Sequence, residues 1–250
     1  MFKAGLNAYT AALKYYQLDG YVTDHINIQT DICQMYIQLF PFYPGDIPTL
    51  CKLNKRTVTI LEPFIPQLNP ASYRTLIGDL AFEVGSAYER LVDLKLEQAR
   101  RDQAPLVRSL EASPAKPPAV VAQINAYVAG AIRNFRILLA PYDQPDTDYT
   151  GFFLTGANAA LNTGRPVPLE LRRPPAKLPS VPSMSLPLYL STHFSLARLF
   201  SRFVSLDRAT VVANLESSLK EYEYAEKFHA TLADQSLFAE EVCFSSPPPL

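Results

Sequence analysis

The sequence predicts an all-α fold built from antiparallel helix pairs. Apolar residues recur at helical spacing through most of the chain, and no region shows the period-two alternation of a half-buried strand. Glycine is scarce, with 9 residues against 22 prolines, which disfavours folds that depend on tight glycine turns. The prolines must then lie in connections or in first helical turns. A succession of helix, short turn and helix is typical of stacked antiparallel pairs.

Residues 1–140 are expected to form one helical-repeat region. Its first helix carries a single apolar stripe, made of Phe2, Leu6, Tyr9, Leu13 and Tyr16. The next four helices are expected at about 22–40, 47–66, 70–101 and 118–140. Asp46 and Asn69 are the predicted N-caps of two of them, because each precedes a proline in the first turn.

The rest of the chain divides into a proline-rich segment and a final helix pair. Residues 141–187 show no sustained period, and we expect a flexible insertion or a loop there. Helical periodicity returns at about 187–205 and 208–231. Residues 188–250 are therefore expected to form a terminal helix pair with a short tail, continuous with the preceding stack.

Small residues beside aromatic ones recur in several predicted helices. "LAFEVGSAY" (80–88) and "THFSLARLF" (192–200) share this character, and "ALKYY" (12–16), "AIRNF" (131–135) and "SLKEY" (218–222) form a second set. Small side chains let two helices approach closely, and aromatic rings fill the groove beside them. The irregular spacing resembles tetratricopeptide pairs in style without being a regular array.

The composition gives no reason to expect nucleic acid or a membrane as partner. The net charge is −1 and the pI is about 6.3, so a strong basic excess is absent. The longest apolar run, 119–139, contains Arg133 and Arg136 among other polar residues, which disfavours membrane insertion. Three distant cysteines do not form a disulfide framework. We expect a soluble, cytoplasmic chain.

Catalytic signatures such as a P-loop or a zinc-binding helix motif are absent from the sequence. The stretch "YYQLDGYVTDHINI" (15–28) is the exception to consider, since Asp19, Asp24 and His25 could form a metal or general-base site. The favoured interpretation is architectural: Asp19 and Gly20 end one helix, and Thr23 or Asp24 caps the next. We predict no catalytic residue, cofactor or metal, and an enzyme using Asp24 and His25 is the least favoured hypothesis.

Several strings resemble the C-terminal part of the kinesin-binding protein family. They are "LDGYVTDHI" (18–26), "CKLNKRTVTILEPFIPQLNPASY" (51–73) and "FEVGSAYERLVDLK" (82–95), with weaker similarity at 197–228. The resemblance implies a right-handed α-solenoid of tetratricopeptide-like helix pairs. It also implies a non-enzymatic regulator that binds kinesin motor domains and blocks their attachment to microtubules. The alternative is a generic helical-repeat scaffold for an unrelated protein partner.

The resemblance also suggests partner-binding residues. A competitor for the tubulin-binding face of a kinesin should offer acidic and aromatic groups, because tubulin is acidic and that face must be basic. Glu83, Tyr88 and Asp93 match the family string and are the first candidates. The second set lies on the acidic helix 214–228 and comprises Glu216, Glu221 and Glu223, which are expected on a solvated face. Leu215, Leu219, Tyr222 and Ala225 are expected to form the core-facing side of that helix.

Members of this family are considerably longer than 250 residues. We therefore expect the sequence to be a fragment, a truncated gene model, or a short homologue completed by another chain. The stripe of the first helix has no preceding helix to cover it, and we expect another copy or an N-terminal half to do so.

Overall fold

The computed structural model describes residues 2–102, 119–143, 179, 181–205 and 207–244. Its helices are α1 (Phe2–Tyr15), α2 (Val22–Ile37), α3 (Ile47–Leu61), α4 (Pro70–Arg101), α5 (Ala119–Asp143), α8 (Leu186–Ser201) and α9 (Arg208–Phe244). Short 3-10 helices are η1 (Phe40–Phe42), η2 (Glu62–Gln67) and η4 (Ser183–Ser185). The described residues contain no strand, and the all-α prediction is confirmed.

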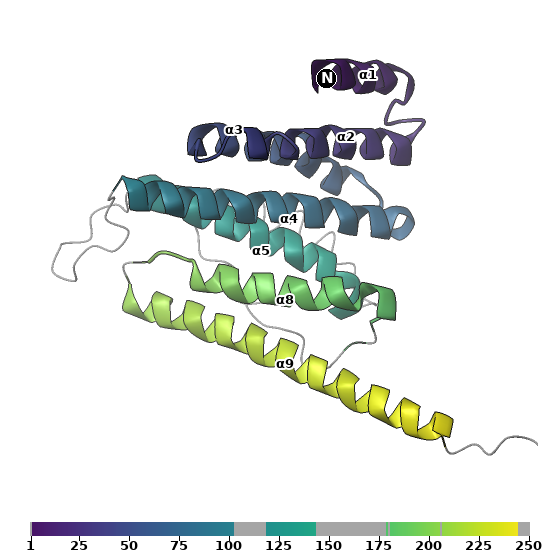
Figure 1. Cartoon of the computed structure of the whole chain (residues 1–250), viewed down its shortest axis with the longest axis vertical. Coiled ribbons are helices and arrows are strands. Elements are labelled where there is room, and N and C mark those ends of the chain that lie inside the picture. The colour runs from purple at the N-terminus through teal and green to yellow at the C-terminus, as the bar shows by residue number, and fades with distance from the viewer. Residues whose placement is uncertain (1, 103–118, 144–178, 180, 206, 245–250) are drawn as a thin grey trace, which may run out of the picture.

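The helices stack in chain order. Contacts join α1 to α2, α2 to α3, α3 to α4, α4 to α5, α5 to α8 and α8 to α9, and the most extensive of these is between α4 and α5. Figure 1 shows the stack running from α1 at one end to α9 at the other, with α5 next to α4 in the middle. Most of the predicted segment 141–187 lies outside the described residues, so that prediction is untested.

Two helices begin where their capping residues predict. The Asp46 carboxylate accepts a hydrogen bond from the Thr49 backbone N–H at 3.1 Å, and the Asn69 side chain accepts one from the Ala71 N–H at 3.0 Å. Both predicted N-caps are confirmed. The third helix ends at Leu61, earlier than the predicted 66. Prolines in the following segment supply no backbone donor, and the chain tightens there into η2.

The turn between α1 and α2 is held by a histidine. The N-cap position of α2 is Tyr21, and no side chain caps it, so the prediction that Thr23 or Asp24 caps this helix is wrong. His25 Nδ1 instead lies 2.8 Å from the Tyr16 carbonyl oxygen. Within the described residues, no three His, Cys, Asp or Glu side chains gather as a metal site would require. His25 therefore acts here as a tie between the end of α1 and α2.

The apolar stripe of α1 faces α2. The Phe2 and Tyr36 rings lie 5.5 Å apart, and Gly5 sits against Met35. The five stripe residues are all half-buried, so the helix that follows, α2, covers part of the stripe. No residue of α1 is fully buried, however. Covering of α1 by another copy or by an N-terminal half stays a prediction.

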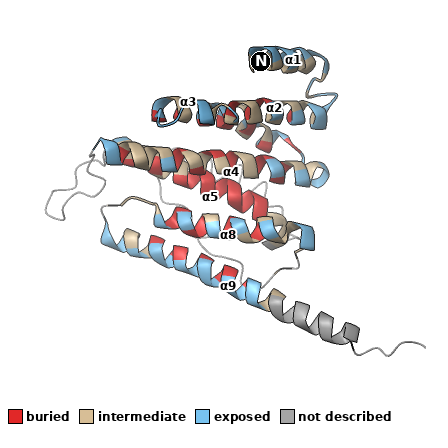
Figure 2. Ribbon diagram, viewed as in Figure 1, coloured by how far each residue is buried: buried red, intermediate tan, exposed pale blue. Residues whose placement is uncertain are grey.

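The core is centred on α5, where every residue from 128 to 139 is buried (Figure 2). Two glycines permit close contact between α4 and α5. A Cβ atom at Gly85 would lie 2.9 Å from the Phe135 ring, and one at Gly130 would lie 2.9 Å from the Tyr88 ring. The predicted combination of small and aromatic residues is therefore a helix–helix contact. None of the described helices has the length and apolar character that crossing a membrane would demand.

Candidate partner-binding surfaces

Glu221 is a fully buried carboxylate between three helices. It forms an ion pair with Arg136 of α5, and its Oε2 lies 2.7 Å from His193 Nδ1 of α8. Burial alone would raise the pKa of Glu221, but the positive charge of Arg136 and the contact with His193 outweigh it and lower this pKa below the ordinary value. The expectation that Glu221 lies on a solvated face is wrong. Its interactions are internal.

The side chain of Tyr88 also makes its contacts within the fold. Its hydroxyl donates to Glu62 Oε2 at 2.9 Å, and Glu62 forms an ion pair with the buried Arg133. Burial raises the pKa of Tyr88 to about 12, so its hydroxyl stays protonated as a donor. Because the ring also packs against Gly130, Tyr88 joins η2, α4 and α5.

Asp93 lies in a bridge between α4 and α8. Its carboxylate pairs with Arg202, and one turn earlier Glu89 pairs with Arg198. Asp93 remains half-exposed, whereas Glu89 is buried. A partner that contacts Asp93 would therefore find its charge already neutralised by Arg202 of the same chain.

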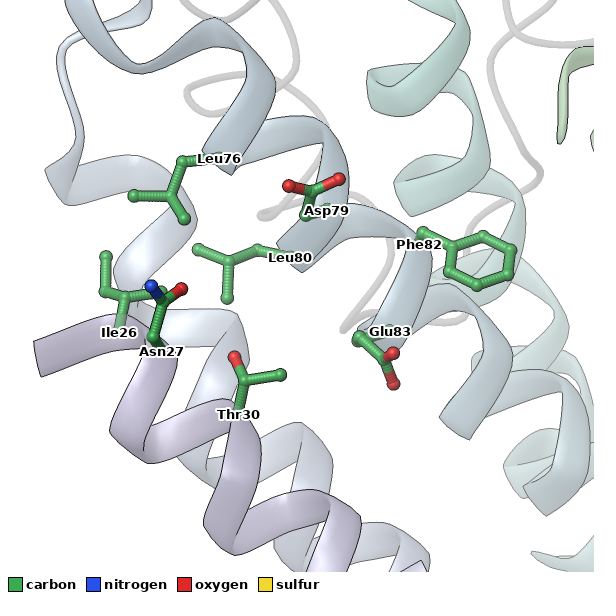
Figure 3. A pocket seen from close by; sticks show the side chains of 8 residues that line it. All are labelled: Ile26, Asn27, Thr30, Leu76, Asp79, Leu80, Phe82 and Glu83. Atoms are coloured by element: carbon green, nitrogen blue, oxygen red, sulfur yellow. The ribbon is translucent and has the colours of Figure 1, made fainter. Parts of the chain in front are cut away.

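Glu83 lines a pocket between α2 and α4 (Figure 3). The pocket has a volume of about 270 Å³, and its lining residues are Ile26, Asn27, Thr30, Leu76, Asp79, Leu80, Phe82 and Glu83. Glu83 Oε1 accepts a hydrogen bond from Gln34 Nε2 at 3.0 Å. Asp79 lies one helical turn before Glu83, so two carboxylates belong to the α4 wall of this pocket.

The pKa of each carboxylate of the pocket is raised above its ordinary value. Partial burial raises the pKa of Asp79. Burial is also the main cause that raises the pKa of Glu83, opposed by Arg90 and by the Gln34 hydrogen bond. None of the ion pairs in the described part of the chain includes Asp79 or Glu83. A partly desolvated pair of this kind suits a lysine or arginine side chain entering from outside.

Asp79 is not among the residues predicted from the sequence. The available signal was its spacing of four residues from Glu83, which places two carboxylates on one side of a helix. The spacing does not show that α2 lies opposite, so that both carboxylates line one pocket.

The predicted core face of α9 points outward. Leu215, Leu219 and Tyr222 are exposed, and only Ala225 of the expected set is buried. The inward face consists of Asn214, Ser217, Ser218, Glu221, Tyr224, Ala225 and Phe228. Glu216 and Glu223 are exposed as expected. The prediction for Leu215, Leu219 and Tyr222 is wrong because this helix buries a polar face whose charged member, Glu221, is paired by Arg136.

Comparison with known proteins places the chain in a family. Residues 1–245 match the family described as "KIF-1 binding protein C terminal". KIF-binding protein from Danio rerio is 26% identical over 230 residues, which is 91% of this chain and 30% of that protein. The Gallus gallus protein is 27% identical over 231 residues (91% and 32%), and the Homo sapiens protein is 26% identical over 224 residues (90% and 30%).

The chain spans about a third of the length of these curated relatives. No solved structure matches it, so the tetratricopeptide-like solenoid stays a prediction. The resemblance noted in the sequence is confirmed by the family match over nearly the whole chain. The chain belongs to the KIF-1 binding protein C-terminal family.

Proposed function

We propose that the chain is a non-enzymatic regulatory protein that binds kinesin motor domains and hinders their attachment to microtubules. The family match and the relatives named KIF-binding protein support a kinesin partner. The stacked helix pairs support a tetratricopeptide-like solenoid, a fold that offers extended binding surfaces. A cytoplasmic location belongs to the same proposal, since kinesins act on microtubules there.

The observation that carries the contact is the pocket between α2 and α4. A motor face that binds acidic tubulin must present lysine and arginine side chains. Asp79 and Glu83 offer two partly desolvated carboxylates in a space of about 270 Å³, which is large enough for one such side chain. A motor side chain held in this pocket is no longer available to tubulin, and microtubule attachment is hindered by competition.

The remaining predicted residues differ in how accessible they are. Glu216 and Glu223 are exposed on α9 and stay a second proposed contact. Asp93 is a weaker candidate because Arg202 already neutralises it. Tyr88 and Glu221 are left out of the proposed surface, since their functional groups bind within the fold.

The test compares two double variants in binding to purified kinesin motor domains. Replacing Asp79→Asn together with Glu83→Gln keeps the shape of the pocket but removes its charge. We expect Kd to rise about tenfold, equivalent to about 1.4 kcal/mol, and the chain to lose its effect on microtubule co-sedimentation. The matched control is Asp19→Asn with Asp24→Asn, two exposed carboxylates in the α1–α2 region, which should leave Kd unchanged.

Two results would count against the proposal. If no motor domain from several kinesin classes binds the chain, the kinesin role is wrong. Affinity purification that then recovers one stable unrelated partner would select the generic helical-repeat scaffold. If motor domains bind but both double variants behave alike, the pocket is not the contact.

A further inference from the structure

An apolar stripe runs along the outside of α9. Val212, Leu215, Leu219 and Tyr222 are 46%, 51%, 56% and 42% exposed. Their spacing of three, four and three residues is that of the seam between two paired helices. Phe194 of α8, 48% exposed, extends the stripe sideways, because its ring lies 6.0 Å from the Tyr222 ring. We call these five residues the outer face of α9.

The α9 residues of the outer face are not among those buried against α8, although the Tyr222 ring contacts Phe194 at its edge. Among the described side chains of α9, the buried ones lie on the side of the helix around Glu221. The outer face therefore adds nothing to the core of the single chain. Large apolar side chains gathered in this way, bordered by charges, are typical of interaction surfaces.

A row of alternating charges borders the outer face. Glu216, Lys220, Glu223 and Lys227 are all exposed. At about 100° per residue, they fall within about 60° of one another on a single flank of the helix. The signs alternate along the row, so its net charge is zero and it offers both signs to a partner in turn.

The order of these charges is self-complementary. Glu216 and Lys227 are equidistant from the midpoint between residues 221 and 222, and so are Lys220 and Glu223. When two such helices run antiparallel about that midpoint, each Glu therefore faces a Lys of the other helix. In a parallel pair the twofold axis runs along the helices and carries the two rows to opposite sides of the seam, where they cannot pair with each other.

We infer that the outer face of α9 binds a second copy of this chain, with the two α9 helices antiparallel about a twofold axis near residues 221 and 222. Leu219 and Tyr222 of the two copies meet near the axis, and the charged rows pair along one flank. Val212 and Leu215 lie farther from the axis, level with residues 231 and 228 of the second copy. One self-complementary patch used by both subunits is the rule for a twofold dimer. The position after Tyr222 in the seam pattern is Glu226, which lies level with residue 217 of the second copy and limits the apolar contact to the residues nearest the axis.

A contact of this length is expected to be weak. Interfaces below about 1,200 Å² are typical of transient association, and we expect a Kd in the micromolar range, on the order of 10 µM. The proposal concerns the chain alone, and it does not rest on kinesin binding. A motor domain that used Glu216 and Glu223 would compete with the second copy.

The experiment is analytical ultracentrifugation of the full chain over about 1–300 µM, a range that brackets a micromolar Kd. We expect a monomer–dimer equilibrium. Leu219→Asp should abolish the dimer, and Glu223→Lys should weaken it at least about tenfold because the introduced lysine then faces Lys220 of the second copy. The double variant Lys220→Glu with Glu223→Lys should restore the affinity, since every pair at these two positions is again of opposite sign.

The matched control is Asp19→Lys, which makes the same kind of charge reversal at an exposed residue in the α1–α2 turn. It should leave the dimer intact. Far-UV circular dichroism shows whether each variant keeps its helix content, which is expected because all substituted positions are exposed. A chain that stays monomeric at 300 µM overturns the inference. A dimer that Leu219→Asp leaves unchanged, or a double variant that fails to recover, also overturns it.

Discussion

Glu221 shows how a single buried carboxylate joins three helices. It lies on α9, pairs with Arg136 of α5 and contacts His193 of α8. Burying a charge is costly, and partners must compensate for the lost water. The two contacts supply that compensation, so removing the carboxylate should cost far more than removing an exposed one.

We expect Glu221→Gln to lower the free energy of unfolding by about 3 kcal/mol, the usual cost of breaking a buried ion pair from one side. The amide keeps the size of the side chain but ends its ion pair with Arg136. Urea unfolding followed by circular dichroism at 222 nm measures the change, since the chain has no tryptophan. The control Glu216→Gln, an exposed carboxylate on the same helix, should change stability by less than about 0.5 kcal/mol.

The same residue predicts a pH dependence. The pKa of Glu221 is lowered in the folded chain, so the stability that it contributes is present above the ordinary glutamate pKa of about 4.3 and is lost as pH falls through the lower folded value. The stability difference between the wild-type chain and Glu221→Gln should therefore be constant from pH 7 to 5 and shrink below about pH 4. A difference that persists unchanged at the lowest pH where the chain is folded would contradict this assignment.

At the level of elements, the contact between α4 and α5 depends on a glycine. A Cβ at Gly85 would lie 2.9 Å from atoms of the buried Phe135 ring. Alanine is the better helix former by about 1 kcal/mol, but forcing a methyl group into a packed core costs about 1–3 kcal/mol. Because the Phe135 ring is itself buried in the core, the steric cost should prevail.

We therefore expect Gly85→Ala to destabilise the chain by about 1 kcal/mol, as the balance of these two effects. Gly20→Ala is the matched control, because a Cβ there meets no atom within 4 Å, and it should be close to neutral. Urea unfolding of the two variants provides the comparison. Equal stabilities for Gly85→Ala and the wild-type chain would mean that α4 and α5 are not in such close contact.

Helix α9 illustrates how one element presents two very different faces. Its inward side carries serines, an asparagine and Glu221, whereas its outward side carries leucines. A prediction that places the leucines of α9 in the core therefore exchanges the inward and outward faces of this helix. The inward orientation is set by Tyr224 and Phe228, which pack among the aromatic side chains of α8.

At the level of the whole molecule, stability should be distributed unevenly along the stack. Helix α5 lies at the centre with residues 128–139 buried, whereas α1 at one end has no buried residue. Elements with few buried contacts open locally, and central elements exchange their amides only through global unfolding.

Hydrogen exchange followed by mass spectrometry should show this gradient. We expect peptides from residues 2–15 to exchange first and peptides from residues 124–142 to exchange last. Residues 70–101 of α4 should follow α5, since the two form the most extensive contact. Equal protection of α1 and α5 would contradict the prediction and would mean that the whole stack opens as one unit.

The helices themselves could be predicted from local information. Asp46 and Asn69, each followed by proline in the first turn, identify two helix starts, and both caps are present. The family was likewise predicted from short strings of residues, and the family match over residues 1–245 confirms it. The pocket could not be predicted in the same way, because Asp79 and Glu83 become a site only where α2 lies against α4.

The all-α class, the helix starts and the family could be predicted from the sequence, because caps, prolines and apolar periods act within a few residues of chain. The packing of the helices was needed to show that Glu221 is internal, that Tyr88 is a packing residue and that the leucines of α9 face outward. Those outcomes depend on charges and rings brought from α5 and α8. A buried carboxylate is stable only where a cation lies beside it. Here that cation comes from a helix far away in the sequence, and a local sequence pattern cannot predict such a contact.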